Sequence, residues 1–508
     1  MFWLALLPVL LILILMVGFQ WGASRAGSAG YLTALLLGLL VFRAGPRLLA
    51  FAHARALLLA LDVLYIIWGA YLLFRVVDEA GGIEVFGKRL PRLTEDRGLQ
   101  ALLIGWAFAS FLQGVGGFGV PVAVIAPILI GLGFGPVPAV VIPSLGHSWA
   151  VTFGSLGSSF NALLAATGLG WEQLAAPAAL LLGAASLGAG AGVAYLAGGW
   201  NSLKRLLLPV LGMGALMAAV QYAAAVGGLW NIAGLLGGSA GLASGTALIL
   251  GRKRGRKGRG KVSFLSRRLL IAFSGYLVLV ALTLAVQLIP PLSEFLGRVV
   301  LTLEFPEVST ALGYTVPAGT GRMITPLRHA GTILTVSSGL AFGIFYRAGW
   351  YQKGAGKRVL GSLVKGMIPS SVGITAMVMM AVIMRDAGMI EQLAEGLSRA
   401  VGRLFPLLSP WVGALGAFMT GSNTNSNLVF ALLQLRTAEV MGIPAAVILA
   451  AQTSGGALGS VIAPTKVIVG ASTAGLAGEE GRVMRALLPY ILLLLLLLSG
   501  LTAVGVSG

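Results

Sequence analysis

The sequence predicts an all-α polytopic membrane protein, and its composition and apolar patterning carry that prediction. The chain has 508 residues, of which 57% are hydrophobic and only 10% are charged, and its mean hydropathy is +0.94. A soluble domain carries about 25% charged residues. Several apolar runs reach the roughly 20 residues that an α-helix needs to cross a bilayer. They cover residues 2–19, 56–74, 269–288 and 487–504.

These runs and the Gly- or Pro-interrupted segments between them divide the chain into helical segments. We expect about 12 to 14 transmembrane or re-entrant helical segments in a single membrane transport domain that covers residues 1–508. The first run has no basic residue ahead of it and is longer than the core of a signal peptide. It is therefore interpreted as a retained helix, with a cleaved signal as the alternative.

The formal net charge is +19, and its distribution argues for membrane topology rather than a nucleic-acid partner. One basic group occupies residues 251–268, and a second comprises Arg43, Arg47 and Arg55. Lys and Arg accumulate in cytoplasmic loops of membrane proteins. We therefore expect both groups to be cytoplasmic, which puts the N-terminus inside, and we expect residues 75–97, with mixed charges, to form an external loop.

Glycine-rich and polar interruptions of the first half recur in the second half in the same order. The first half, residues 1–250, has its repeat core at about 100–170, and the second half, residues 269–508, has its core at about 407–477. Matched interruptions are typical of secondary transporters built from two inverted repeats with broken helices and hairpins. Glycines that only allow close helix packing are the alternative. An offset of 307 residues superposes Gly114 on Gly421, Gly135 on Gly442, Ala150 on Ala457 and Gly168 on Gly475.

An uncharged polar stretch at residues 420–427 lies inside apolar sequence. Such a stretch is tolerated at membrane depth only where protein or water surrounds it, and its hydroxyls and amides can bind a small anion or a cation. We predict that residues 113–119 and 420–427 approach one another near the membrane midplane and bind a small carboxylate. The predicted binding residues are Gln113, Gly114, Gly116, Gly117, Gly119, Ser148, Ser155, Ser422, Asn423, Thr424, Asn425, Asn427, Gln452, Thr453 and Ser454.

Ionisable residues inside apolar sequence are candidates for ion coupling. Asp62 either relays protons or pairs with a basic residue of another helix. His147 titrates near neutral pH, with a structural hydrogen-bonded role as the alternative, and Lys466 either pairs with a substrate carboxylate or lies at a helix end. Arg322 and Arg328 could bind a carboxylate bidentately or anchor a short loop.

Motifs of soluble enzymes are missing from the sequence. It contains no phosphate-binding loop of the Walker type, no zinc-spaced His pair and no nucleophile elbow. The chain has no cysteine, which excludes disulfides and thiolate metal sites. We therefore predict neither an enzyme nor a metal site nor a cofactor; a membrane-embedded enzyme acting on lipids is the least favoured alternative.

Six short motifs relate the chain to a known family. They lie at residues 113–123, 131–134, 151–157, 421–427, 453–456 with 462–464, and 475–480. On these motifs, and in its hydropathy along nearly the full length, the chain resembles the lactate permease family of bacterial and archaeal secondary transporters. Ser422-Asn423-Thr424 is also similar to a hairpin-tip triplet of a wider ion-transporter superfamily, in which it contacts a carboxylate or a sodium ion.

The resemblance implies uptake of L-lactate, D-lactate or glycolate across the plasma (inner) membrane, coupled to H⁺. A sodium-coupled carrier of another organic anion is the alternative. The expected partners are the lipid bilayer and the small carboxylate, and a homodimer is left open. The resemblance also implies ionisable residues at three positions where this chain has Gln113, Asn423 and Ser460. Coupling in this chain is therefore expected to use other groups.

Overall fold

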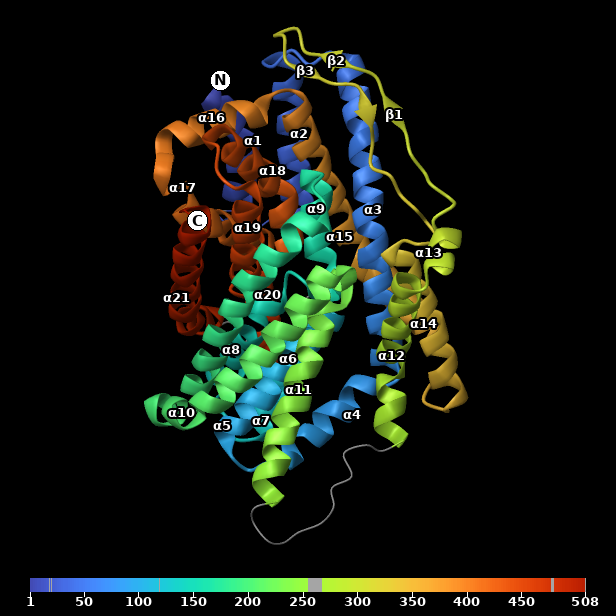
Figure 1. Ribbon diagram of the computed structural model, residues 1–508, viewed down its shortest axis with the longest axis vertical. Coiled ribbons are helices and arrows are strands. Elements are labelled where there is room, and N and C mark those ends of the chain that lie inside the picture. Colours follow the sequence, from blue (N-terminus) through green and yellow to red (C-terminus); the bar gives the residue numbers. More distant parts are fainter. Residues whose placement is uncertain (18, 20, 118, 255–266, 477–478, 508) are drawn as a thin grey trace.

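The computed structural model describes residues 1–508 except 18, 20, 118, 255–266, 477–478 and 508 (Figure 1). The described chain is almost entirely helical, which confirms the predicted all-α class. The α-helices are α1 (Phe2–Val17), α2 (Ala23–Leu40), α3 (Pro46–Glu79), α4 (Gly82–Arg89), α5 (Arg97–Gln100), α6 (Ala109–Val115), α7 (Val120–Gly131), α8 (Pro136–His147), α9 (Ser158–Thr167), α10 (Trp171–Ala224), α11 (Trp230–Arg254), α12 (Arg267–Leu288), α13 (Pro290–Leu296), α14 (Ala330–Arg347), α15 (Ala355–Asp386), α16 (Met389–Val401), α17 (Phe405–Thr420), α18 (Asn423–Met441), α19 (Ala445–Val461), α20 (Pro464–Thr473) and α21 (Glu480–Ser507).

Short helical turns and two small antiparallel ribbons complete the described elements. The 3₁₀ turns are η1 (Leu90–Leu93), η3 (Ser148–Ala150), η4 (Ser155–Gly157) and η6 (Gly402–Leu404), and the π-helical segments are η2 (Ala101–Phe108) and η5 (Ala225–Leu229). The strands are β1 (Glu304–Phe305), which pairs with β4 (Gly319–Thr320), and β2 (Val308–Ser309), which pairs with β3 (Thr315–Val316).

Several helices are long and apolar enough to cross a membrane. Among the described residues there are seven, or up to eight if the bent pair α12 and α13 counts as one span. By contrast, α7 is apolar but has only 12 residues, too few for the roughly 20 that a spanning helix requires. Helix α10 is interrupted at Gly198 and Gly199, where the backbone leaves the helical conformation. The chain folds back there, so that a Cβ at Gly183 would lie 3.1 Å from Ala218.

Two blocks of the chain share one order of helices and breaks. The first runs from α5 to α9 and the second from α17 to α20. In each block a helix ends at a break, a second helix begins, a turn reverses the chain, and a third helix ends at another break. When 307 is added to the residue numbers of α9, its first and last residues fall within one residue of those of α20. The inverted orientation of the two halves remains a prediction.

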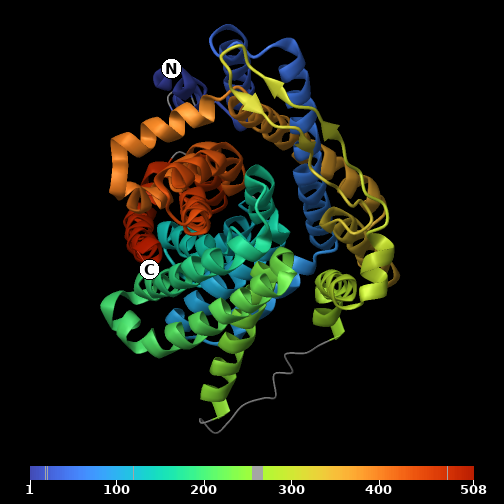
Figure 2. The ribbon, with the colours of Figure 1, turned by 45° about the horizontal axis from the view of Figure 1, so that its top comes forward.

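A second layer, made of α2, α3, α12, α14 and α15, lies beside these blocks (Figure 2). The segment that carries β1 to β4 runs along α3 (Figure 1). Just before the start of α3, the carbonyl of Arg43 accepts a hydrogen bond from the backbone N–H of Ala311. The first block touches this layer through its hairpin, since a Cβ at Gly116 would lie 3.0 Å from the Phe74 ring. The hairpin tip of the first block therefore lies against α3.

The start of α3, which carries Arg47, lies at the opposite end of the molecule from the ends of α11 and α12 that carry the described part of the basic loop (Figure 1). Helix α3 has 34 residues, about 50 Å at 1.5 Å per residue, and Arg47 lies in its first turn. Beyond its other end, a Cβ at Gly82 would lie 3.5 Å from the carbonyl of Ala272 in α12. Residues 75–97 therefore share an end with the flanks of the basic loop, whose centre lies outside the described residues. If α3 crosses the membrane, the two basic groups cannot both be cytoplasmic.

Candidate substrate-binding site

The hairpin tip of the second block is formed by a glycine and a capping serine. Gly421 ends α17 in the left-handed conformation, with φ 71°, which glycine adopts at little cost. The Ser422 side chain then accepts a hydrogen bond from the backbone N–H of Asn425 at 3.3 Å and caps α18. A Cβ at Gly421 would lie 2.4 Å from Thr465 Oγ1. This tip therefore lies against the break between α19 and α20.

Asn423 joins the two blocks through buried hydrogen bonds. Its Nδ2 donates to Thr152 Oγ1 and to the carbonyl of Thr453, both at 3.1 Å. The hydroxyl of Thr152 donates to that same carbonyl at 3.0 Å. All three residues are at most 1% exposed. Because a buried amide without partners is costly, this arrangement fixes the position of the break after α8 relative to α18.

A second set of contacts joins α18 to α9. Asn427 Nδ2 donates to the carbonyl of Ser159 and to Thr453 Oγ1, both at 2.9 Å. The hydroxyls of Ser159 and Thr424 are hydrogen bonded at 3.1 Å. Thr453 therefore receives bonds from Asn423 and Asn427 of α18, and it lies at the centre of the polar cluster.

A layer of amides lies behind this cluster. Gln452 Nε2 donates to Ser426 Oγ at 3.1 Å, and its Oε1 accepts a hydrogen bond from Gln434. Gln434 Nε2 also donates to the carbonyl of Ser409 at 3.0 Å. These buried side chains connect α17, α18 and α19, so Gln452 holds the second block together rather than facing the first block.

The hairpin tip of the first block is built from backbone rather than from polar side chains. Gly117 has φ 57°, and a Cβ there would lie 1.9 Å from Ser155 Oγ. A Cβ at Gly154 would lie 2.8 Å from Gln113 Nε2. Ser155 and Leu156 have φ of 46° and 55°, a conformation that costs about 1–3 kcal/mol for a residue other than glycine. Such strain is typical of functional sites.

Several buried polar atoms in and beside the two blocks have no hydrogen-bond partner among the described residues. Most of them are acceptor oxygens, and buried polar groups are normally satisfied. Asn423 Oδ1 points at Gly456, where a Cβ would lie 2.1 Å away, so glycine is required there. The unpartnered atoms are Gln113 Oε1, His147 Nε2, Asn161 Nδ2, Asn423 Oδ1, Asn425 Oδ1, Asn427 Oδ1, Gln434 Oε1 and Ser454 Oγ.

Two of the three predicted coupling residues lie near one another. His147 is 1% exposed, and its Nδ1 lies 2.6 Å from the carbonyl of Pro143, so Nδ1 carries a proton and the unpartnered Nε2 is free to accept another. Lys466 is partly buried and donates to Ser460 Oγ at 3.0 Å, and its positive charge opposes a positive charge on the His147 ring. Ser148 bonds instead to the carbonyl of Leu145 in its own helix.

The third coupling candidate, Asp62, is 2% exposed and pairs with two residues of the segment before α14. Arg322 Nε donates to Asp62 Oδ2 at 3.0 Å, and His329 Nε2 lies 2.9 Å from Oδ1. Because His329 Nδ1 accepts a hydrogen bond from the backbone N–H of Gly331, the ring proton lies on Nε2, which donates a hydrogen bond to Asp62 Oδ1. The ion pair left open by the sequence is thus present, and Arg322 is engaged with Asp62 rather than free for a substrate.

The structure unites part of the predicted site. Residues 420–427 meet residues 152 and 159, while residues 113–119 meet residues 154 and 155. Among the described residues, the two tips are thus linked through 151–159. Several residues that make or support this link are not among the individually predicted binding residues. Thr152 and Ser426 lie within the predicted motifs 151–157 and 420–427, whereas Ser159, Gln434 and Thr465 lie in helices without a polar run that marks them.

Four helices begin at the breaks that surround this cluster. They are α7 and α9 in the first block and α18 and α20 in the second. Helix N-termini carry unpaired N–H groups and a partial positive charge, and they favour anions when they point at a ligand. The cluster thus combines such N-termini with buried hydroxyls and amides, and it is a candidate site for a small anion.

Comparison with known proteins gives a match along nearly the whole chain. A family model described as L-lactate permease matches residues 1–506. The chain is 26% identical to the glycolate permease GlcA of Escherichia coli K12, over 95% of this chain and 91% of that protein. It is 27% identical to the L-lactate permease of Bacillus subtilis 168, over 98% of this chain and 95% of that protein. Among solved structures, the YdaH transporter of Alcanivorax borkumensis is similar with a TM-score of 0.48 and 16% identity, over 88% of this chain and 86% of that chain.

Proposed function

We propose that this chain, which belongs to the L-lactate permease family, is a secondary active transporter of a small monocarboxylate, either L-lactate, D-lactate or glycolate. Its relatives are named permeases, so the chain is a transporter and not an enzyme. Glycolate and L-lactate are the cargoes that the names of the relatives contain. Both are small 2-hydroxy acids, so a single uncharged polar site with hydroxyl and amide groups suits either.

The observation that carries the proposal is the buried polar cluster that joins the two blocks. Asn423, Asn427 and Thr453 are buried together with Thr152 and Ser159, although the surrounding chain is apolar. A carboxylate bound there would exchange the bonds of the two asparagine amides to Thr453 for bonds to its own oxygens. Movement of the two blocks against the layer of α3 and α15 would then give alternating access.

Proton coupling is part of the proposal, with His147 and Lys466 as the coupling residues. The unpartnered Nε2 of His147 is the atom that would take the proton. The Lys466 ammonium opposes a positive charge on the His147 ring, so a change at one of the two groups would be felt by the other. Asp62 fits this role less well, because its carboxylate is held by Arg322 and His329. We assign to Asp62 a role in the stability of the second layer, where it joins α3 to the segment before α14.

Sodium coupling is the second candidate, and one observation favours it. The side-chain oxygens of Asn423, Asn425 and Asn427 are buried and have no hydrogen-bond partner in the described part of the chain, and amide oxygens are suitable ligands for a hard cation. These oxygens lie on the first turns of α18, beside the same cluster. A sodium ion there would replace the proton as the coupling ion.

The proposed location is the plasma membrane, with the basic end of the molecule in the cytoplasm. By the positive-inside rule, the ends of α11 and α12 that flank residues 251–268 face the cytoplasm. Figure 1 shows the N-terminus at the other end of the molecule, together with the start of α3, which carries Arg47. The N-terminus is therefore proposed to lie outside, opposite to the sequence-based expectation. A homodimer stays a prediction that light scattering of the purified protein can test.

Transport assays in proteoliposomes test the proposed function and separate the two coupling ions. Uptake of labelled L-lactate, D-lactate, glycolate and a dicarboxylate is measured under separately imposed proton and sodium gradients. We expect accumulation of a monocarboxylate driven by an inward proton gradient and abolished by a proton uncoupler. Accumulation driven only by sodium would support the second candidate. Saturable uptake of none of the acids would overturn the proposal.

A further inference from the structure

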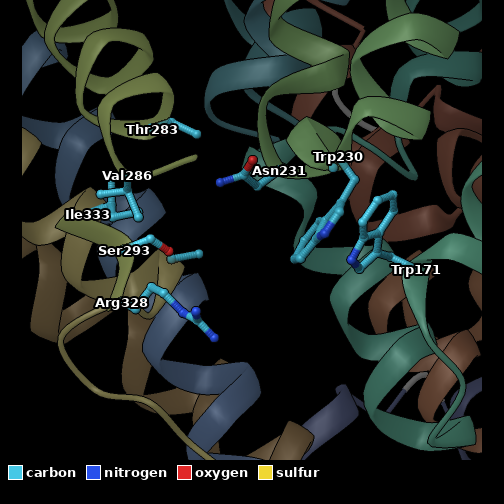
Figure 3. Close-up of a pocket in the computed structure, with 10 residues that line it drawn as sticks. Trp171, Trp230, Asn231, Thr283, Val286, Ser293, Arg328 and Ile333 are labelled. Atoms are coloured by element: carbon cyan, nitrogen blue, oxygen red, sulfur yellow. The ribbon is translucent and has the colours of Figure 1, made fainter. Parts of the chain in front are cut away.

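A cleft of about 440 Å³ lies between the start of α11 and the layer of α12 to α14 (Figure 3). Figure 3 shows Trp171, Trp230 and Asn231 on one side and Thr283 and Arg328 on the other. The two walls belong to the two layers of the fold. A ligand in this cleft would therefore contact both layers at once.

Arg328 makes the cleft electropositive. Of the ten lining residues that Figure 3 draws, Arg328 is the charged one. Its side chain is exposed, and Figure 3 shows that it reaches into the cleft. Arg322 is paired with Asp62, whereas Arg328 has no ion-pair partner among the described residues. Thr283 adds a hydroxyl that is 3% exposed and lacks a hydrogen-bond partner. Both groups are available to an anion.

The aromatic wall connects the cleft with the polar cluster. The rings of Trp230 and Phe160 lie 5.7 Å apart, and Cβ on Gly157 would lie 2.9 Å from both Trp230 and Asn231. Phe160 follows Ser159, which bonds to Thr424 in the cluster. One layer of side chains therefore separates the cleft from the proposed transport site.

We propose that the cleft is a second binding site for a monocarboxylate, in which Arg328 holds the carboxylate and the tryptophan rings cover the apolar part. A guanidinium binds a carboxylate with two parallel hydrogen bonds, and the Asn231 amide supplies a further donor from the opposite wall. The choice of a monocarboxylate rests on the proposed function. Substrate captured there lies next to the strained break at residues 155–157, through which it would reach the polar cluster.

Binding of labelled L-lactate and glycolate to the purified full-length protein, by equilibrium dialysis, tests this inference. Wild type is expected to bind two molecules of acid per chain. Arg328→Gln should retain one, and it should raise the KM for uptake roughly tenfold, as expected for loss of a charge-assisted hydrogen bond. Arg328→Lys keeps the positive charge but cannot form two parallel hydrogen bonds, so its KM for uptake should lie between those of wild type and Arg328→Gln. Asn231→Asp adds a negative charge with little change in volume and should act like Arg328→Gln.

Two further variants separate the cleft from the cluster. Arg298→Gln removes an exposed arginine that does not line the cleft and should leave binding and KM unchanged. Asn423→Leu, or Thr453→Val if the first variant aggregates, should retain one molecule of acid whose binding Arg328→Gln removes. One bound acid per wild-type chain, unaffected by Arg328→Gln, would overturn the cleft site alone. If wild type bound neither acid, the proposed function would fall with it.

Discussion

The two hairpin tips occupy corresponding places in the two blocks but use different chemistry. In the first tip, Gly116, Gly117 and Gly119 offer backbone, and Gly117 is packed against Ser155 at a distance that excludes a Cβ. The second tip offers side chains, with Asn423 bonded across to Thr152. The strained residues, 155 and 156, also belong to the first block.

This difference shows how a repeated backbone plan can produce one asymmetric site. The second block supplies the amide donors Asn423 and Asn427. The first block supplies a closely packed surface and the oxygens of Thr152 and Ser159 that accept from these amides. Substitutions that add volume should therefore be most harmful in the first tip, whereas substitutions that remove donors should be most harmful in the second. The predictions below test this division of roles.

The largest effect is expected for Asn423→Leu in the second tip. The substitution removes the donor to Thr152 and Thr453 and leaves the buried Thr152 hydroxyl oxygen without its amide donor, at about 1–3 kcal/mol. We expect loss of measurable monocarboxylate uptake into proteoliposomes and a lower unfolding temperature. Asn201→Leu, at an exposed position, is the matched control and should behave as wild type. Wild-type uptake by Asn423→Leu would show that the amide is not part of the site.

A smaller but large loss is expected for Gly117→Ala in the first tip. The new Cβ would meet Ser155 Oγ at 1.9 Å, and φ is 57°, which costs about 1–2 kcal/mol for a residue with a Cβ. Uptake should fall by roughly one order of magnitude. Addition of Ser155→Gly should restore part of it, because the clash is removed and the left-handed conformation at 155 suits glycine.

Gly212→Ala provides the control for this variant, since a Cβ there meets nothing within 4 Å. It should transport as wild type does. If Gly117→Ala were also harmless, or if Ser155→Gly failed to improve it, close packing between Gly117 and Ser155 would not be what the first tip requires.

The ionisable groups are also distributed unequally, and His147→Gln tests their role. The offset of 307 places Ser454 opposite His147, so the first block alone has a titratable group at this place. We expect the variant to lose accumulation driven by a proton gradient while it still exchanges labelled for unlabelled substrate. Retained proton-driven accumulation in His147→Gln would exclude His147 as the coupling residue.

Asp62→Asn should instead lower the stability of the folded protein by about 3–5 kcal/mol, because it leaves Arg322 without its buried partner.

The sequence predicted the breaks well and the contacts across them poorly, for physical reasons. Glycine and polar runs disturb an apolar helix wherever they occur, so the tips near Gly117 and Gly421 were recognisable. Ser159 lies in a helix where a hydroxyl usually bonds to its own backbone, and its bond to Thr424 depends on folding across 265 positions. Counting charges also does not reveal that the length of α3 lies between Arg47 and the described ends of the basic loop, so the sidedness of the two basic groups stays a prediction.

The smallest effect concerns how the two blocks begin. The Asp96 carboxylate accepts from the backbone N–H groups of Gly98 and Leu99 at 2.9 and 3.2 Å and caps the first block. Helix α17 begins at Phe405 with a proline in its first turn and no side-chain cap. Asp96→Ala should therefore destabilise the protein by about 1 kcal/mol at pH 7, while a substitution of Leu404, which has no capping side chain, to Ala should have less effect.

The Asp96 cap should also depend on pH. Burial raises the pKa of Asp96, but the hydrogen bonds from Arg205 and the two backbone N–H groups lower it by a larger amount. The pKa of Asp96 therefore lies below the ordinary value for an aspartate. A carboxyl group with a depressed pKa stabilises the folded state above its unfolded pKa, about 4, and loses this contribution as the pH falls through the folded pKa. The unfolding temperatures of wild type and Asp96→Ala should thus converge below about pH 4. A difference that is absent at pH 7, or that grows on acidification, would show that the first block does not depend on this cap.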